Sequence, residues 1–257
     1  MRIVVIGTGH MGSWFVRELS KEHEVAVYDI DKEKMKGIKN VRHLENLSEI
    51  PSFKPEFLIN AVSLKNTIKA FEAVTKYLPP HCIISDIASI KCELPEYYRK
   101  CDFRYASIHP MFGPRFANFE KLKKENVIIL KESDESAKHF FRGLFEKHGL
   151  NIFEYSFDEH DRLMAYSLTL PFSSSIVFSA CVTTKTVPGT TFAKHREIAQ
   201  KLLEEDDYLL AEVLFNPYSL KQIENVISRL EFLKDVIRTK NYEKAIKFFD
   251  KLRENLQ

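Results

Sequence analysis

Short apolar runs alternate with helical patterns along the first half of the chain. The runs that predict strands cover residues 2–6, 24–28, 57–62, 82–87, 105–108, 127–130 and 151–155. Between them, apolar positions recur at helical spacing over residues 11–22, 67–77, 93–99 and 135–148. Strands that alternate with helices of this length form βαβ units, so the pattern predicts an α/β domain with a doubly wound, mostly parallel sheet.

After about residue 157 the strand-like runs end and helical periodicity takes over. Two apolar stripes carry it, formed by Leu220, Ile223, Ile227, Leu230 and Ile237 and by Tyr242, Ile246, Phe249, Leu252 and Leu256. We therefore predict one domain at 1–156 and an all-helical domain at 157–257. Such a domain cannot bury every apolar stripe alone, which favours a homodimer formed through it.

Residues 163–182 carry no charge, and this length raises the question of a membrane span. The segment contains five serines, a threonine and Pro171, which is a high polar content for hydrocarbon. The buried centre of a helical domain or dimer has the same character. We predict no membrane span.

The composition of the chain narrows the class of protein further. The 257 residues suit two modest domains, and a net charge of +2 without a basic block argues against nucleic-acid binding. Four cysteines without C-x-x-C spacing suit free thiols in a reducing cytosol better than disulfides or a zinc site. The amino terminus leads straight into a glycine-rich turn and does not resemble a signal peptide. We expect a cytoplasmic protein without a bound metal.

The glycine-rich turn Gly7-Thr8-Gly9-His10-Met11-Gly12 follows the first predicted strand and opens the first predicted helix. Gly7 permits a tight turn, Gly9 lets the backbone approach a pyrophosphate, and Gly12 lets the helix pack closely on the strand. His10 and Met11 lie inside the loop beside the cofactor, although the pattern gives His10 no role of its own. The motif predicts a Rossmann-type dinucleotide site.

Asp29 ends the second predicted strand about 20 residues after the glycine motif, where a carboxylate binds the adenosine ribose hydroxyls. An acid there repels the extra phosphate of NADP, which favours NAD. Val62 and Ser63, with Ala88 and Ser89, follow two further strands at the edge where such sheets bind ligands. Ser63 taken alone is equally compatible with ordinary strand termination.

His109 lies in the stretch Ser107-Ile108-His109-Pro110-Met111-Phe112-Gly113-Pro114, at the end of a predicted buried strand. Proline and glycine make the following turn rigid. Histidine is the side chain best suited to accept a hydroxyl proton near neutral pH. The position therefore predicts a general base beside the nicotinamide.

The sequence resembles the prephenate dehydrogenase family in four segments that occur in order: GTGHMG, SDIASIK, SIHPMFGP and EHDRLMAYSLTLP. The resemblance covers essentially the whole chain. It implies a nicotinamide-binding domain followed by a helical domain that forms the dimer. It also implies the reaction, in which prephenate loses its hydroxyl proton to a histidine, hydride to NAD and its ring carboxylate as carbon dioxide.

The resemblance assigns roles to particular residues. His109 matches the family base, and Ser89 matches a serine that hydrogen-bonds this histidine and the substrate hydroxyl. His160 and Asp161 match a histidine–acid pair that we interpret as structural or pocket-lining. The chain departs from the family where many members have histidines in an S-H-L-P-H-like stretch. Ser167 and Thr169 stand in that segment here, and we expect them to line the substrate site.

A dianionic substrate needs a cation, ideally the bidentate fork of an arginine. The resemblance places one in the segment 191–197, where Arg196 is the first candidate and Lys194 the second. Arg115, next to the HPMFGP block, is a further candidate. A solvated helix face is the alternative interpretation of the basic residues in 191–197.

Other functions fit parts of the sequence. Arogenate differs from prephenate by an amine in place of a keto group, and no residue that we can place contacts that group. A β-hydroxyacid dehydrogenase or imine reductase would share the architecture, but we find no glycine-flanked catalytic lysine motif. A regulatory protein that senses NAD without turnover would need neither His109 nor Ser89.

Overall fold

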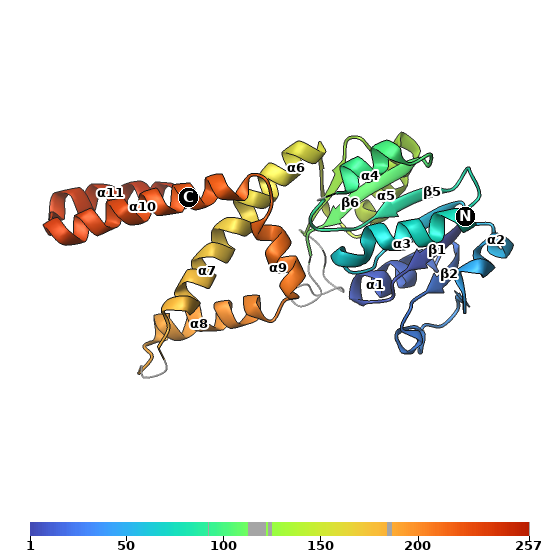
Figure 1. Ribbon diagram of the computed structural model, residues 1–257, viewed down its shortest axis with the longest axis horizontal. Coiled ribbons are helices and arrows are strands. Elements are labelled where there is room, and N and C mark those ends of the chain that lie inside the picture. Colours follow the sequence, from blue (N-terminus) through green and yellow to red (C-terminus); the bar gives the residue numbers. More distant parts are fainter. Residues whose placement is uncertain (92, 113–121, 123–124, 184–186, 257) are drawn as a thin grey trace. The chain divides into compact units, whose positions relative to one another are not determined.

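The computed structural model describes residues 1–91, 93–112, 122, 125–183 and 187–256 (Figure 1). The chain divides into two units, Met1–Arg162 and Leu163–Gln257, which we describe separately.

The first unit is built on one eight-stranded sheet with the strand order β3-β2-β1-β4-β5-β6-β7-β8. Its strands are β1 Arg2–Ile6, β2 Glu24–Tyr28, β3 Arg42–His43, β4 Phe57–Asn60, β5 Ile83–Asp86, β6 Tyr105–Pro110, β7 Asn126–Leu130 and β8 Asn151–Tyr155. Neighbouring strands are parallel except for β6 and β7, which run antiparallel with His109 opposite Ile128. The order reverses direction at β1, so the predicted doubly wound sheet is confirmed.

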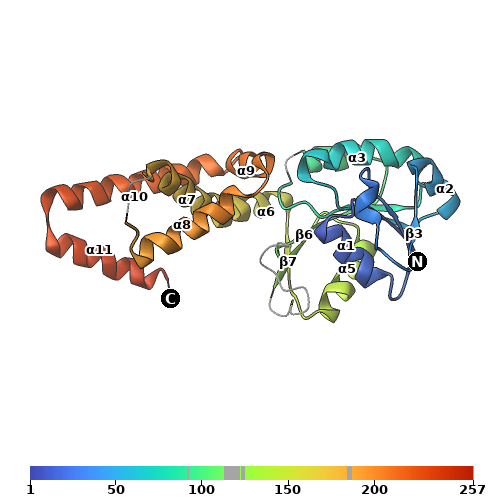
Figure 2. The same ribbon diagram turned by 90° about the horizontal axis from the view of Figure 1, so that it is seen from below.

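Helices cover both faces of the sheet (Figure 2). On one face lie α1 His10–Leu19 and α5 Glu135–Lys147, whose aromatic side chains pack on Val5, Ile59 and Ile108. On the other lie α2 Ile50–Phe53, α3 Thr67–Val74 and α4 Leu94–Lys100. Short 3-10 turns complete the unit at Lys32–Met35, Leu47–Glu49, Leu64–Asn66 and Thr75–Tyr77. Side chains along β5 and β6 alternate between the two faces of the sheet. Ser85 and Ala106 therefore face α1 and α5, while Asp86, Ser107 and His109 face α3 and α4.

Most predicted elements of this unit occur with small shifts at their ends. The helix predicted at 11–22 ends at Leu19, and the strand predicted at 57–62 ends at Asn60. The strand β3 was not expected, because its two residues are exposed and leave no apolar pattern. In β6 the strand continues through His109 to Pro110, because β7 pairs with its last residues.

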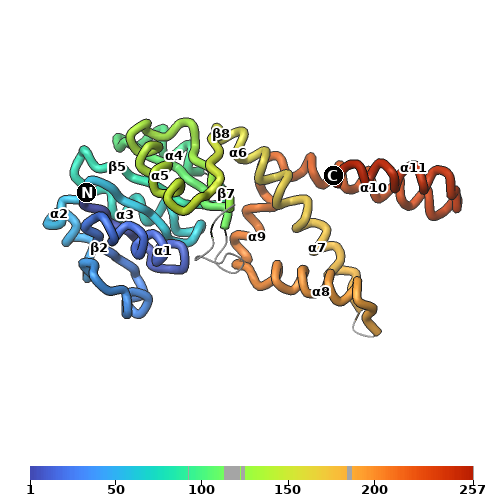
Figure 3. The backbone as a smooth tube through the Cα atoms, turned by 180° about the vertical axis from the view of Figure 1, so that it is seen from behind, coloured from blue at the N-terminus to red at the C-terminus, as the bar shows by residue number. Residues whose placement is uncertain are grey.

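The described part of the second unit is helical throughout, as predicted. A π-helical turn, Ala165–Thr169, joins α6 Phe157–Met164 to α7 Leu170–Cys181. The helices that follow are α8 Thr190–Leu203, α9 Asp207–Leu214, α10 Ser219–Thr239 and α11 Tyr242–Glu254. Helices α10 and α11 lie side by side (Figure 3), with Phe232 against Phe248 and Lys244 paired with Asp235.

The division between the units falls inside α6, whereas the sequence pattern places it at 156, just before this helix. The first turns of α6 stay with the sheet because their side chains contact it. Phe157 stacks on Tyr98, and Glu159 forms an ion pair with Lys131 at 2.7 Å. His160 is buried against His109.

Among the described residues, one helical run, Phe157–Cys181, is long and apolar enough to cross a membrane by length and composition, with a mean hydropathy of 1.3. Its first turns carry Asp158, Glu159 and Asp161. His160 and Thr169 are fully buried and hydrogen-bonded to other parts of the protein. These contacts favour a helix of the folded protein over a membrane span.

Candidate functional site

The glycine turn connects β1 to α1 in a conformation that depends on two of its glycines. Gly7 has a φ of +86°, and a Cβ there would lie 2.7 Å from backbone atoms of Ala61 and Val62. A Cβ on Gly12 would lie 1.9 Å from the Gly7 carbonyl oxygen. By contrast, a Cβ on Gly9 would meet no atom within 4 Å. The packing of the fold thus explains Gly7 and Gly12, whereas Gly9 leaves room for a ligand at the amino end of α1.

Asp29 is buried at the end of β2 and stabilises this turn directly. Its Oδ2 accepts hydrogen bonds from the backbone N–H of Thr8 at 2.7 Å and from the Thr8 hydroxyl at 3.0 Å. Its Oδ1 accepts from the N–H of Asp31 at 2.9 Å. Each carboxylate oxygen has two lone pairs, so Oδ1, which accepts one of these hydrogen bonds, retains acceptor capacity for a ribose hydroxyl. The link to Thr8 was not expected from the sequence, where Asp29 was interpreted as a ligand contact alone.

The other predicted cofactor residues lie at the same sheet edge. His10 is exposed, while Met11 and Val62 are half-buried. Ser63 is exposed, and its hydroxyl accepts a hydrogen bond from Asn66 at 2.9 Å.

His109 is buried in β6, with 6% of its surface exposed. Its Nδ1 lies 3.1 Å from Nε2 of His160, and the two rings meet edge to face. The Nδ1 of His160 in turn lies 3.1 Å from Oδ1 of Asp161. The resemblance predicts only a structural or pocket-lining role for His160, whereas in the structure His160 is the hydrogen-bond partner of the predicted base.

The order of these bonds assigns the imidazole protons. A carboxylate is an acceptor only, so the Nδ1 of His160 donates to Asp161, and a neutral His160 has its lone pair on Nε2. The bond between the rings then requires His109 to donate from Nδ1. The remaining nitrogen of His109, Nε2, is left unprotonated, which is the state that a general base needs.

Burial lowers the pKa of His109 well below its usual value, and the neighbouring His160 and Lys91 lower it further. Burial also lowers the pKa of His160, while its hydrogen bond to Asp161 acts in the opposite direction. His109 is therefore neutral at physiological pH.

Ser89 is half-buried in the loop that follows β5. Within the described part of the chain, the hydrogen bond of His109 goes to His160 and not to Ser89. The contact between Ser89 and His109 stays a prediction.

A buried ion pair lies on the same face of the sheet as His109. Lys91 Nζ donates to Asp86 Oδ2 at 2.7 Å and to the carbonyl of Ile108 at 2.8 Å, and Tyr98 donates to Asp86 Oδ1 at 2.7 Å. Asp86 and Lys91 belong to the segment SDIASIK, whose resemblance to the family assigns a role to Ser89 alone. A lysine among apolar residues, five positions after a strand-end aspartate, was the available signal.

The predicted substrate contacts fall mainly in the second unit. Arg196 and Lys194 are exposed on α8. Ser167 donates to the carbonyl of Leu163 at 2.8 Å. Thr169 is fully buried, and its hydroxyl is bonded to Ser219 at 2.6 Å. Arg115 lies outside the described residues.

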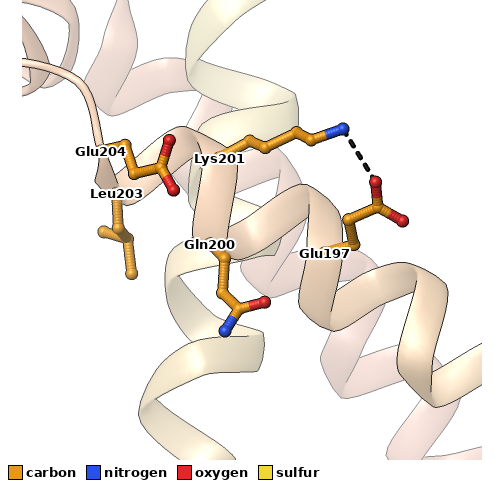
Figure 4. A pocket seen from close by; sticks show the side chains of 5 residues that line it. All are labelled: Glu197, Gln200, Lys201, Leu203 and Glu204. Atoms are coloured by element: carbon orange, nitrogen blue, oxygen red, sulfur yellow. Dashed lines mark hydrogen bonds and ion pairs between the residues drawn. The ribbon is translucent and has the colours of Figure 1, made fainter.

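A shallow depression lies along the last turns of α8 in the second unit (Figure 4). It is lined by Glu197, Gln200, Lys201, Leu203 and Glu204. Lys201 is paired with Glu197 at 2.8 Å on the exposed helix surface. These side chains form a solvated helix face and not a binding site.

Comparison with known proteins supports the resemblance found in the sequence. No family model matches the chain. A probable arogenate/prephenate dehydrogenase of Methanocaldococcus jannaschii is 25% identical over 263 residues, which cover 95% of this chain and 58% of that protein. The chain thus spans little more than half the length of this curated relative.

Solved structures share the fold over almost the whole chain. Prephenate dehydrogenase from Aquifex aeolicus, in complex with hydroxyphenyl propionate and NAD+, has a TM-score of 0.82 at 16% identity, covering 99% of this chain and 96% of that one. Arogenate dehydrogenase from Synechocystis has a TM-score of 0.79 at 16% identity, covering 99% and 98%. The resemblance to the prephenate dehydrogenase family is therefore confirmed in sequence and in fold.

Proposed function

We propose that the chain is an NAD-dependent dehydrogenase that oxidatively decarboxylates prephenate to 4-hydroxyphenylpyruvate in tyrosine biosynthesis, with His109 as general base. The observation that carries the proposal is the buried imidazole of His109, whose Nδ1 is bonded to His160, which is itself bonded to Asp161. Among the described residues, this arrangement leaves Nε2 of His109 to accept a proton. The likeness to prephenate and arogenate dehydrogenases supports the reaction class.

The glycine turn fits a dinucleotide. The open space at Gly9 lies at the amino end of α1, where backbone N–H groups bind a pyrophosphate. NAD bound there supplies the hydride acceptor. Asp29 would bind the hydroxyls of the adenosine ribose through its carboxylate, and its negative charge would disfavour the additional phosphate of NADP.

His109 performs the proton transfer in this proposal. Its Nε2 takes the proton of the substrate ring hydroxyl as the carbon that bears this hydroxyl loses hydride and the ring carboxylate leaves as carbon dioxide. The ring oxygen then takes a proton back from the imidazolium, which gives the phenol of the product. The resulting imidazolium keeps its Nδ1–H bonded to His160, which is itself bonded to Asp161. The two partners thus hold the ring in one tautomer and stabilise the charge that forms.

The first experiment mixes the purified protein with NAD and prephenate and follows NADH by absorbance, with parallel runs using arogenate and NADP. Turnover of prephenate with NAD is expected. Turnover of arogenate alone would assign the alternative substrate. Binding of NAD without turnover of either would refute the proposal and favour a related dehydrogenase or an NAD sensor.

A variant tests the base. We expect His109→Asn to lower turnover by roughly a hundredfold or more while NAD affinity stays nearly unchanged, because a general base contributes on this scale. His139→Asn, at an exposed position on α5, is the matched control. Equal turnover in His109→Asn and the parent would remove His109 from the mechanism.

A cation in the helical unit is expected to bind the substrate carboxylates, with Arg196 ahead of Lys194 and Arg115 as a further candidate. Separate Arg196→Met and Lys194→Met variants would identify it. Substitution of the residue that binds the carboxylates should raise KM for the substrate, whereas substitution of the other exposed residue should change this KM little. If both leave KM unchanged, the cation lies elsewhere.

The second unit leaves many apolar side chains exposed, and we propose that a second copy of the chain covers them in a cytoplasmic homodimer. Exposed residues of α10 and α11 include Leu220, Ile227, Leu230, Ile237, Tyr242, Ile246, Phe249 and Leu252. Many exposed apolar side chains on two helices favour association.

A further inference from the structure

Lys91 has a charged side chain that is completely buried inside the first unit, the one built on the sheet, with 0% of this side chain exposed. Lysine is almost never buried without a partner, because removing an ammonium from water is costly. Here the ammonium is bonded to Asp86, which is also fully buried and accepts a further hydrogen bond from Tyr98. Because this ion pair is costly to bury, we expect it to hold a particular part of the structure in place.

The second bond of Lys91 lies next to His109. Strands β5 and β6 pair in parallel as far as Asp86 and Ser107. In a parallel ladder with this register, the N–H of Ala88 would next donate to the carbonyl of Ile108. Instead, the N–H of Ala88 turns back to Asp86 Oδ2 at 3.0 Å, and Lys91 Nζ bonds the Ile108 carbonyl at 2.8 Å. The lysine thus replaces the ladder bond at the peptide that leads into His109.

In the described part of the chain, the titratable groups of the hydrogen-bond network around His109 come from three elements. Lys91 and Asp86 come from β5 and its following loop, and Tyr98 comes from α4. His160 and Asp161 come from α6. Lys91 is the fixed cation in this set, and its charge disfavours a second positive charge on either imidazole.

We propose that Lys91 is a positioning residue for His109: anchored by Asp86, it fixes the Ile108–His109 peptide where β5 ends. The importance of this for catalysis rests on the proposed function, in which His109 is the base. The effect of Lys91 on His109 itself does not rest on the proposed function, so the positioning role and the proposed function can be refuted separately.

The test compares the pKa of His109 in the parent protein and in Lys91→Met by NMR of histidines carrying a carbon-13 label, with His109→Asn to assign the resonance. We expect His109 of the parent to stay neutral to the lowest pH at which the protein is folded. In Lys91→Met its pKa should rise, because the charge of Lys91 is one of the causes that lower it. An unchanged pKa in folded Lys91→Met would overturn the proposal.

Two further variants separate positioning from general stability. Tyr98→Phe removes one hydrogen bond from Asp86 but leaves the ammonium and the Ile108 carbonyl in contact, so it should lower stability without moving the pKa of His109. If Lys91→Met does not fold, Asp86→Asn/Lys91→Met removes both buried charges and should still raise this pKa. Equal pKa shifts in Tyr98→Phe and in the lysine variant would show a merely structural role.

An activity profile adds the functional consequence. With prephenate and NAD, the acidic limb of kcat/KM should move to higher pH in Lys91→Met by the same amount as the NMR shift. A shift of the NMR pKa without turnover in any variant would support the positioning role and refute the proposed reaction. A profile that does not follow the NMR pKa would refute the link between Lys91 and the base.

Discussion

The burial of His109 makes the stability of the sheet unit depend on pH. Its pKa is lowered in the folded state, so the unfolded chain binds a proton that the folded chain does not. The stabilising contribution is complete above the ordinary histidine pKa of about 6.5 and is lost as the pH falls from there towards the folded-state pKa. Acidification alone is therefore the perturbation.

The size of this loss of stability follows from the difference in bound protons between the folded and the unfolded chain. For a histidine that stays neutral when folded and titrates at about 6.5 when unfolded, lowering the pH from about 7.5 to about 5.5 costs ~1.4 kcal/mol. His160 adds to the loss by a smaller amount, because Asp161 supports its charged form. A typical domain is stable by about 5–15 kcal/mol, so the change is measurable.

Urea denaturation at each pH, followed by tryptophan fluorescence, measures this loss. Trp14 is the chain's single tryptophan and is buried against Phe145 and Phe112 in the same unit as His109. The variant His109→Asn cannot titrate and should lose about 1.4 kcal/mol less than the parent over the same range. The exposed His139→Asn should behave like the parent.

The comparison between His109→Asn and the parent isolates His109, because all other residues are the same in the two proteins. Identical pH dependence in His109→Asn and the parent would refute the conclusion that the folded protein holds this imidazole neutral. A parent that becomes more stable on acidification would contradict the sign of the argument.

Three further predictions concern the glycine turn, the ribose contact and the dimer. Gly9→Ala should keep the melting temperature but weaken NAD binding in calorimetry by about tenfold or more, equivalent to ~1.4 kcal/mol; Gly12→Ala, whose Cβ would meet the neighbouring turn at 1.9 Å, should lower the melting temperature itself. Asp29→Asn should relax the kinetic preference for NAD over NADP, and an unchanged ratio would mean that the carboxylate does not contact the ribose. Ile246→Asp should give monomers in analytical ultracentrifugation, whereas the exposed Lys251→Asp should not; dimers in both would move the interface elsewhere.

The sequence predicted the architecture well because the sheet is buried on both faces. Its strands are apolar runs, such as those ending at Ile6 and Leu130, and turn signals separate them from amphipathic helices. The pattern could not predict the antiparallel pairing of β6 with β7, because strand direction leaves no mark in hydrophobic periodicity. It also missed β3, whose residues are exposed.

The candidate site was predictable only where a local motif carried it. The glycine turn and His109 stand next to residues that constrain the backbone, and both lie where the sequence placed them. His160 is 51 positions away from His109, and no local pattern couples them. The bonds of Asp29 to Thr8 and of Lys91 to Ile108 were likewise missed, because they depend on which strand ends meet in space.

The ion pair between Asp86 and Lys91 also restricts how this sequence can evolve. A chain that lost either residue first would pass through an intermediate with a lone charge in the protein interior, at a cost of about 3–5 kcal/mol. That cost is comparable to the whole stability of a marginal domain. Single mutational steps away from the pair are therefore strongly destabilising, while the double replacement is less costly. Among descendants of this chain, the two positions should covary, being either retained or exchanged together.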